Sequence, residues 1–381
     1  MKLTAKIKLQ PNHVQHQALI DTLKVANAAC DYISQVAWDK QVFGKFNIQK
    51  LVYHDVKDKF GLTAQVVIRC IGKVTDAYKL DKKTKRTFSQ LGAIPFDDRI
   101  LKYWLDKQTV SIWTVEGRQK MKYQAGQRQL DLLKTRKGES DLVLIDDKFY
   151  LFSTCDVEDG HPDDVEGVLG IDLGIVQIAS DSDGKSFSGS QVTSIRKRRF
   201  RQRKRLQSKG TKSAKRVLKR IKRKESRFAK DVNHTISKRI VEKAKRTGYA
   251  IALENLKGIR DRIRARKSQR YTLHSWSFHD LIEKIKYKAK LAGVMVIDID
   301  PRNTSKTCSN CGHCSKSNRK TQSEFLCVSC GFSANADTNA ALNISAKGWG
   351  VLSIAHTDRA LTDVLGQINV VPNPRALAVG N

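Results

Sequence analysis

Three acidic residues occupy positions where a carboxylate could do chemistry. Asp172 ends an apolar stretch that predicts a strand, beside a glycine that permits close approach of a ligand; Glu254 ends a second such stretch, and Asp337 lies in the first turn of an expected helix. Each alone has an ordinary role, as a turn acceptor, a salt-bridge partner or a charge favoured by the helix dipole. Together they can bind two Mg²⁺ or Mn²⁺ ions, which clamp the attacking and leaving oxygens of an in-line phosphodiester displacement by water. Asp298 and Asp300 are possible outer acids or surface groups.

Four cysteines have the spacing of a metal-binding ribbon. Cys308-x2-Cys311 and Cys327-x2-Cys330 are separated by fifteen residues, and a glycine follows each pair, which lets the chain turn under a knuckle. Four thiolates around one Zn²⁺ form a closed structural site with no open position for water. Cys314 is a spare thiol or a replacement for Cys311. Basic residues in or beside the ribbon could also contact nucleic acid: Lys306, Lys316, Arg319 and Lys320.

The surrounding pattern predicts the elements of the amino-terminal part. Residues 2–10 alternate and predict a strand, apolar residues recur at helical spacing from 13 to 38, and 47–60 and 63–79 predict two more helices. Residues 88–155 return to short alternating runs. A strand, a helical insertion and further strands indicate a β-barrel interrupted by a helical lobe.

Beyond an acidic linker at 156–164, the pattern becomes α/β. Three short strands are expected, the first ending at Asp172, with a hairpin turn at Asp183-Gly184 between the other two. Helices and further strands follow, and a last helix is expected from Ala336 to Ala346, with no clear period from about Gly350. Three short strands after a first-strand aspartate, then helices and more strands, are how an RNase H-like fold begins.

The charge of the chain points to a polyanionic partner. Its 381 residues include 71 Lys and Arg against 38 Asp and Glu, a formal net charge of +33, which most simply indicates nucleic acid. No stretch predicts a transmembrane helix or a secretory signal, so no membrane partner is expected. Cys30, Cys70 and Cys155 are scattered and expected in the core. Reduced thiols in such a chain favour a cytoplasmic location, and a nucleic-acid partner favours association with the nucleoid.

The positive charge is concentrated between residues 196 and 230, where 19 of 35 residues are Lys or Arg and only Glu225 is acidic. Apolar residues still mark a helix face, so a helix pair is predicted. So many cations would repel one another without a polyanion, and cations on phosphates give affinity without sequence information. We predict that the following residues contact nucleic acid: Arg196, Lys197, Arg198, Arg199, Arg201, Arg203, Lys204, Arg205, Lys219, Arg220, Lys222 and Arg223.

A second basic segment at 257–270 precedes a group of aromatic and histidine residues. These residues either stack on bases or pack the next helix. They are Tyr271, His274, Trp276, Phe278 and His279.

Several segments resemble the TnpB (OrfB) proteins of bacterial insertion sequences, a family similar to the compact type V CRISPR nucleases. The resemblance covers about residues 1–347 and is most specific from 168 to 347. The segments are Lys6-Ile7-Lys8-Leu9-Gln10-Pro11-Asn12, Gly170-Ile171-Asp172-Leu173-Gly174, Leu253-Glu254-Asn255-Leu256, Tyr287-Lys288-Ala289-Lys290-Leu291-Ala292-Gly293, the run from Asp300-Pro301-Arg302-Asn303-Thr304 to Cys308-Ser309-Asn310-Cys311-Gly312, and Asp337-Thr338-Asn339-Ala340-Ala341-Leu342-Asn343-Ile344.

The resemblance implies an α/β plus β-barrel architecture. A wedge-like β-barrel (1–12 and 86–160) would be interrupted by a helical recognition lobe (13–85). An RNase H-like, RuvC-like nuclease domain (166–304 and 332–350) would contain an inserted zinc ribbon for target loading (305–331). A flexible tail (351–381) would follow.

The resemblance also implies RNA-guided DNA cleavage. RNA from the transposon end would be the guide, with one protein monomer per RNA, and double-stranded target DNA would be cut next to a short flanking motif. Asp172, Glu254 and Asp337 would be the catalytic acids that bind Mg²⁺, and the four ribbon cysteines would bind Zn²⁺. Asn335-Ala336 precedes the third acid where many relatives have Asp-Arg, which removes a possible charge pair but no acid.

The reader of the flanking motif is expected in the helices at 13–79. Candidates are Gln65, Arg69 and Lys73, whose alternative role is plain surface. Two further functions stay open: a guide-independent transposase or resolvase on the same fold, and a nuclease-inactive DNA-binding regulator. The three intact acids argue against the regulator, and the amino-terminal lobe and high charge argue against a bare resolvase.

Overall fold

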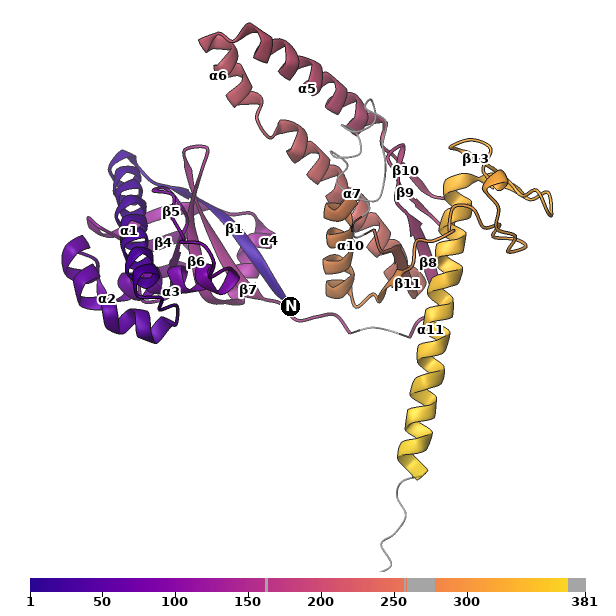
Figure 1. The fold of residues 1–381 in the computed structure, drawn as a ribbon, viewed down its shortest axis with the longest axis horizontal. Helices are drawn as coiled ribbons and strands as arrows, with labels where there is room; N and C mark the ends of the chain where they lie inside the picture. Colours follow the sequence, from indigo (N-terminus) through magenta and orange to yellow (C-terminus); the bar gives the residue numbers. More distant parts are fainter. Residues whose placement is uncertain (162–163, 257, 259–277, 369–381) are drawn as a thin grey trace, which may run out of the picture. The chain divides into compact units, whose positions relative to one another are not determined.

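A computed structural model gives the fold and describes residues 1–161, 164–256, 258 and 278–368. The chain divides into two compact units, Met1–Glu158 and Asp159–Asn381 (Figure 1). Each unit has its own hydrophobic core. Among the described residues, no helix is both long and apolar enough to cross a membrane.

Seven strands of the first unit form one antiparallel sheet in the order β2-β6-β7-β1-β5-β4-β3. The strands are β1 (Lys2–Gln10), β2 (Ile94–Phe96), β3 (Leu101–Trp104), β4 (Thr109–Thr114), β5 (Gly117–Gln124), β6 (Arg136–Ile145) and β7 (Lys148–Asp156). The sheet is nearly closed, because the Tyr103 hydroxyl on β3 lies 3.3 Å from Ser140 on β6 and 2.7 Å from Ser153 on β7. The first and last strands are neighbours, with Lys2 opposite Asp156.

Helices interrupt this sheet where helical spacing predicted them. They are α1 (His13–Asp39), α2 (Lys45–Phe60) and α3 (Ala64–Leu80), and a short α4 (Gln127–Lys134) lies where only strands were predicted. Leu23, Ile33 and Val74 of these helices share one core with Ile7 and Leu151 of the sheet. The helices and the barrel-like sheet therefore form a single packing unit. The three scattered cysteines are buried in it, as predicted.

The second unit is built on a five-stranded sheet in the order β10-β9-β8-β11-β12. The strands are β8 (Gly167–Asp172), β9 (Gln177–Asp181), β10 (Ser186–Ser188), β11 (Tyr249–Glu254) and β12 (Val296–Ile299). β8, β11 and β12 run parallel, whereas β9 and β10 are antiparallel. The predicted hairpin at Asp183-Gly184 joins β9 and β10, and Gly184 has φ +84°, a conformation that favours glycine.

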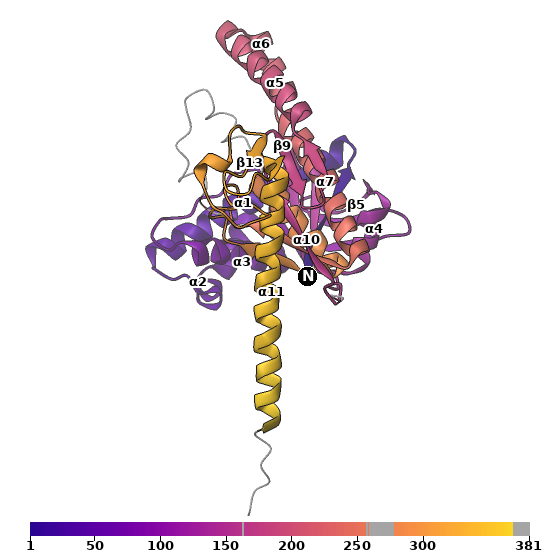
Figure 2. The ribbon, with the colours of Figure 1, turned by 90° about the vertical axis from the view of Figure 1, so that its right-hand side faces the viewer.

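The remaining elements of this unit cover the sheet or project from it. They are α5 (Ser190–Lys209), α6 (Lys212–Ile221), α7 (Lys224–Thr247), α10 (Phe278–Ala292), a 3₁₀ turn (Lys316–Asn318), β13 (Glu324–Leu326), β14 (Ser333–Asn335) and α11 (Ala336–Ile368). α7 and α10 pack with Leu169 and Leu253 on one face, and α11 packs with Val168 and Ala252 on the other. Because both faces are buried, these strands are almost continuously apolar. Figure 2 shows α5 and α6 extending beyond the sheet and α11 running past it the other way.

The last helix is longer than predicted. It begins at Ala336 but continues to Ile368 instead of ending at Ala346, so residues 351–368, for which no regular element was predicted, are helical. Gly348 lies inside this helix. A Cβ there would meet the Ala252 side chain at 2.7 Å, so this glycine permits close packing. Residues 369–381 of the predicted tail lie outside the described part of the chain.

Candidate functional site

Close packing of α11 on β8 places the third acid beside the sheet. A Cβ at Gly170 would lie 2.1 Å from the carbonyl oxygen of Ala341 and 2.4 Å from the nitrogen of Ser345. The Ser345 hydroxyl donates to the Val168 carbonyl at 2.5 Å. The space that glycine opens in this strand is therefore filled by α11 and not by a ligand, which corrects the sequence expectation.

The structure brings the three predicted acids together. Asp172 and Glu254 end neighbouring parallel strands that pair in register up to Ile171 and Leu253, and Asp337 lies in the first turn of α11. Burial raises the pKa of Asp172, and the charges of Glu254 and Asp337 raise it further, to about 7. Carboxylates from three distant parts of the sequence thus lie close enough to repel one another.

Glu254 is oriented by a residue that the sequence did not single out. The hydroxyl of Thr304, which is 4% exposed, donates to Oε1 of Glu254 at 2.6 Å. Burial raises the pKa of Glu254, whereas this hydrogen bond and the charge of Lys347 lower it. Thr304 lies in the loop between β12 and the first zinc ligand, and nothing in the local pattern indicates that its side chain turns back to a strand end.

Arg319 brings a positive charge from the cysteine region to the acids. Its guanidinium lies 3.8 Å from Oδ1 of Asp337. Burial raises the pKa of Asp337, and Arg319 lowers it. The sequence suggested Arg319 as a nucleic-acid contact and missed this proximity. Asn335 accepts from the backbone nitrogens of Asp337 and Thr338 at 2.9 and 3.3 Å, as a helix cap does.

The four ribbon cysteines form a closed set. Their Sγ atoms all lie within 4.8 Å of one another, with Cys308 3.7 Å from Cys330 and Cys311 3.6 Å from Cys327. A glycine with positive φ follows each pair, at +77° and +73°. Four sulfurs at these distances suit a structural zinc ion. Cys314 is exposed and is not a member of the set.

The acids fit a different kind of metal. Within the described ranges, the cysteines are the one group of three or more His, Cys, Asp or Glu side chains whose ligand atoms lie within 4.8 Å, so the acids stand further apart. Carboxylate oxygens are the donors that Mg²⁺ prefers, usually with water completing its shell. Burial and the charges of Glu254 and Asp337 raise the pKa of Asp172 to about 7, although the charge of Arg319 lowers it. A cation would relieve this repulsion, so the donor set suits Mg²⁺ or Mn²⁺.

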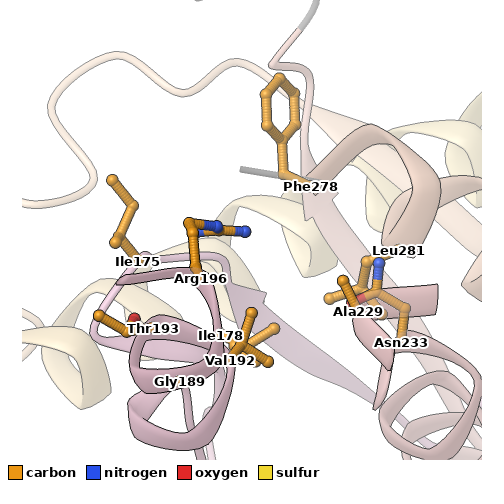
Figure 3. Close-up of a pocket in the computed structure, with 10 residues that line it drawn as sticks. All are labelled: Ile175, Ile178, Gly189, Val192, Thr193, Arg196, Ala229, Asn233, Phe278 and Leu281. Carbon is orange, nitrogen blue, oxygen red and sulfur yellow. The ribbon is translucent and has the colours of Figure 1, made fainter. Parts of the chain in front are cut away.

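The predicted nucleic-acid residues lie on α5, α6 and the turn before α7, which together we call the basic arm (190–223). Nine of the twelve are exposed, Arg199 and Arg203 are half-buried, and Arg196 is buried. Arg203 lies 2.8 Å and Arg196 3.6 Å from the Glu225 carboxylate. Arg196 therefore lies at the base of the arm, where it lines a cavity of about 20 Å³ (Figure 3).

The aromatic group after the second basic segment is described only in part. Phe278 is buried among the side chains that pack α10, which agrees with the packing role, and His279 is exposed. Tyr271, His274 and Trp276 lie outside the described residues, as does nearly all of the segment at 257–270.

The three candidates for reading a flanking motif make contacts within the first unit. Arg69 lies 3.6 Å from Asp97 and also pairs with Glu139, and Gln65 donates to Asp97. Lys73 donates to Asn27 at 2.5 Å. Their role in motif reading stays a prediction.

Two protein-family models match separate stretches of the chain, which lie almost entirely within the second unit. A family described as "Probable transposase" (OrfB, IS605) matches residues 154–260, and one described as "Cas12f1-like, TNB domain" matches residues 278–344. The solved Cas12f1–sgRNA–target DNA complex aligns with a TM-score of 0.57 at 17% identity, over 87% of this chain and 82% of that one. At this identity, the likeness shows the fold.

Curated relatives match over parts of the chain. The CRISPR-associated endodeoxyribonuclease Cas12f1 of Sulfoacidibacillus thermotolerans is 44% identical over 31% of this chain and 27% of its own length. InsQ of Escherichia coli K12, named as a candidate RNA-guided DNA endonuclease, is 28% identical over 51% of each. The TnpB-like protein MJ0751 of Methanocaldococcus jannaschii is 28% identical over 53% of this chain and 76% of its length. The chain spans about half or less of the length of the first two.

The family matches and the named relatives agree with the resemblance that the motifs indicated. With the acids on neighbouring elements and the cysteine set in the matched TNB region, the second unit is similar to the TnpB (OrfB) proteins of insertion sequences and to Cas12f1.

Proposed function

We propose that the protein is a metal-dependent, RNA-guided DNA endonuclease in which Asp172, Glu254 and Asp337 are the catalytic acids. The observation that carries the proposal is their convergence, which raises the pKa of Asp172 to about 7 through burial and two neighbouring carboxylates. Strongly shifted pKa values cluster at functional sites, and three acids beside one another in a chain of net charge +33 fit such a site.

The topology supports an RNase H-like, RuvC-like core. Its mixed sheet carries an antiparallel hairpin at one edge and three parallel strands, and its acids stand at the ends of two of the parallel strands. The third acid comes from a helix on one face. A phosphodiester would approach the three carboxylates at the carboxyl ends of β8 and β11.

Two Mg²⁺ ions bound there would supply charge neutralisation and an activated water. The three acids would hold these ions, Thr304 would fix the Glu254 carboxylate, and Arg319 would place a positive charge near a phosphate that enters beside Asp337. The cysteine set would hold one Zn²⁺ and thereby fix the ribbon that carries Arg319.

The proposal of a guide RNA and a DNA target rests on the positive charge of the basic arm and on what the relatives are named for. On the basic arm, nine of the twelve predicted contact residues are exposed and can neutralise phosphates. The Cas12f1 neighbour was solved with an sgRNA and target DNA, and InsQ is named for RNA-guided cleavage. RNA from the transposon end would be the guide, with one protein per RNA, and base pairing would read the target.

The domain assignment belongs to the same proposal. The barrel-like sheet (1–12 and 86–160) would be the wedge, and α1–α3 (13–85) the recognition lobe. Residues 166–304 and 332–350 would form the nuclease domain around the zinc ribbon at 305–331. The shared core of sheet and helices suggests that wedge and lobe act as one rigid piece.

A guide-independent transposase is the alternative, favoured by the description of the OrfB family as a probable transposase. To separate the two, we would express the full chain with its flanking DNA and sequence the RNA that co-purifies. We expect one RNA that ends in sequence from outside the element, and Mg²⁺-dependent, EDTA-sensitive cleavage of a matching duplex. Random RNA together with joining of transposon ends would refute RNA guidance.

A further inference from the structure

One face of α11 is hydrogen-bonded to the loop that leads from β12 to the four ribbon cysteines. Asn339, Asn343 and Lys347 are spaced four residues apart, so their side chains stand one above another along the helix. Each donates to backbone carbonyl groups of the loop at 300–309. We call these three residues the carbonyl ladder.

The contacts cover the loop from end to end. The amide of Asn343 donates to the carbonyl groups of Thr304 and Thr307 at 2.8 and 2.7 Å, and that of Asn339 donates to Thr307 at 2.9 Å. The backbone nitrogen of Ser309 donates to Oδ1 of Asn339 at 3.0 Å. The ammonium group of Lys347 donates to the carbonyl groups of Asp300 and Arg302, at 3.1 and 2.6 Å.

The ladder therefore holds the loop by its backbone. Asn339 is fully buried and Asn343 is 8% exposed. Buried amides of this kind destabilise a protein unless their hydrogen bonds are made, so the loop is held in one arrangement. An apolar contact would pack the same helix without defining the position of the loop backbone to this degree.

The loop transmits this position to the acid site through Thr304. Its carbonyl accepts from Asn343, and its hydroxyl donates to Oε1 of Glu254 at 2.6 Å. Hydrogen bonds to a ligating carboxylate orient it and adjust its basicity. One continuous chain of contacts thus runs from α11, which also carries Asp337, to the carboxylate on β11.

We propose that the carbonyl ladder and Thr304 are positioning residues that fix the Glu254 carboxylate and thereby set the divalent-metal affinity of the acid site. The inference rests on the proposed function, since it assigns these residues a role toward the same three acids. None of the four side chains needs to touch the substrate.

Replacement of the Thr304 hydroxyl tests the proposal most directly. Thr304→Val keeps the shape of the side chain and removes its donor, and Thr304→Ser restores the donor. Thr307→Val is the matched control, because the Thr307 hydroxyl donates to Asn303 in the same loop and not to an acid. Mn²⁺ binding by the purified full-length protein is measured by calorimetry, with zinc content and melting temperature measured in parallel.

We expect Thr304→Val to weaken Mn²⁺ binding about tenfold and to raise the Mg²⁺ concentration for half-maximal cleavage in step. Zinc content should be unchanged, and Thr304→Ser and Thr307→Val should behave as the wild type. Asn343→Ala should weaken Mn²⁺ binding in the same direction. If Asn343→Ala fails to fold, the comparison of Thr304→Val with Thr304→Ser still tests the proposal.

The two proposals fail in different ways. If the wild type binds Mn²⁺ and cleaves DNA while Thr304→Val matches it in both, the positioning role is wrong and the proposed function stands. If the wild type neither binds Mn²⁺ nor cleaves, both are overturned.

Discussion

The two candidate metal sites of the second unit are built in opposite ways. The four candidate zinc ligands lie within one short stretch, from Cys308 to Cys330, and their sulfurs stand within 4.8 Å of one another. The acids come from Asp172, Glu254 and Asp337, and they approach without closing into such a set. The cysteine site is local in the sequence, whereas the acid site depends on tertiary packing.

The difference follows from charge and from chain connectivity. Short loops with glycines of positive φ bring the thiols together, and their remaining protons are released when a metal binds. Carboxylates carry their charge at neutral pH, so convergence raises the pKa of Asp172 instead of closing the site. Packing must therefore hold the acids beside one another, whereas the cysteine site is closed by its own backbone.

The largest expected effect is on the acid site alone. Asp172→Asn should lower DNA cleavage by about a thousandfold, or about 4 kcal/mol in the barrier, because a central carboxylate of the metal site loses its charge. Zinc content and RNA binding should stay at wild-type values, measured by metal analysis and a filter-binding assay. Asp298→Asn is the matched control, since that acid pairs with Lys286 at 2.6 Å; equal loss of cleavage in both variants would contradict the assignment.

Loss of the local site should affect both sites. Cys327→Ser should reduce zinc from about one ion per chain to almost none and should lower cleavage, because the ribbon that holds Arg319 beside Asp337 loses its order. Metal analysis and cleavage assays measure the two effects. Cys314→Ser should keep both zinc and activity, and full zinc retention by Cys327→Ser would refute the four-cysteine set.

The packing that holds the acid site can be tested away from the acids. Gly170→Ala should destabilise the protein by about 2 kcal/mol, because its Cβ would overlap the backbone of α11, and should lower cleavage by displacing Asp337. Thermal unfolding reports the first effect. Gly72→Ala, at a helical position with no atom within 4 Å of the new Cβ, should be neutral or slightly stabilising. Equal melting temperatures for the two variants would argue against close packing at Gly170.

The smallest effect is expected for Arg319, which connects the cysteine region to the acids. Arg319→Gln should lower cleavage about tenfold, or about 1.4 kcal/mol, because the acid site loses its neighbouring cation while the zinc site stays intact. Single-turnover cleavage measures the loss of activity, and zinc analysis shows whether the ribbon has unfolded. Lys320→Gln, the exposed neighbour, should have little effect, and a larger loss there than at Arg319 would assign the role to general nucleic-acid contact.

The same contrast explains what could be predicted from the sequence. Cysteine spacing identified the zinc set because its geometry is local. Asp172 and Glu254 were found because each ends an apolar strand, and parallel strands bring their carboxyl ends to one edge. Thr304 and Arg319 were missed because they reach the acids through the folding of loops near the cysteines. No local sequence pattern predicts such a tertiary contact. α11 was underestimated because Gly348 resembles a stop signal in sequence but serves packing in the fold.

The pairing of Lys2 with Asp156 in the first unit has a consequence for engineering. The two ends of this module therefore lie beside each other on neighbouring strands in the middle of the sheet, as in domains that tolerate circular permutation and insertion. The ends of the module could be joined and the chain reopened at a surface turn without changing the pairing of its strands.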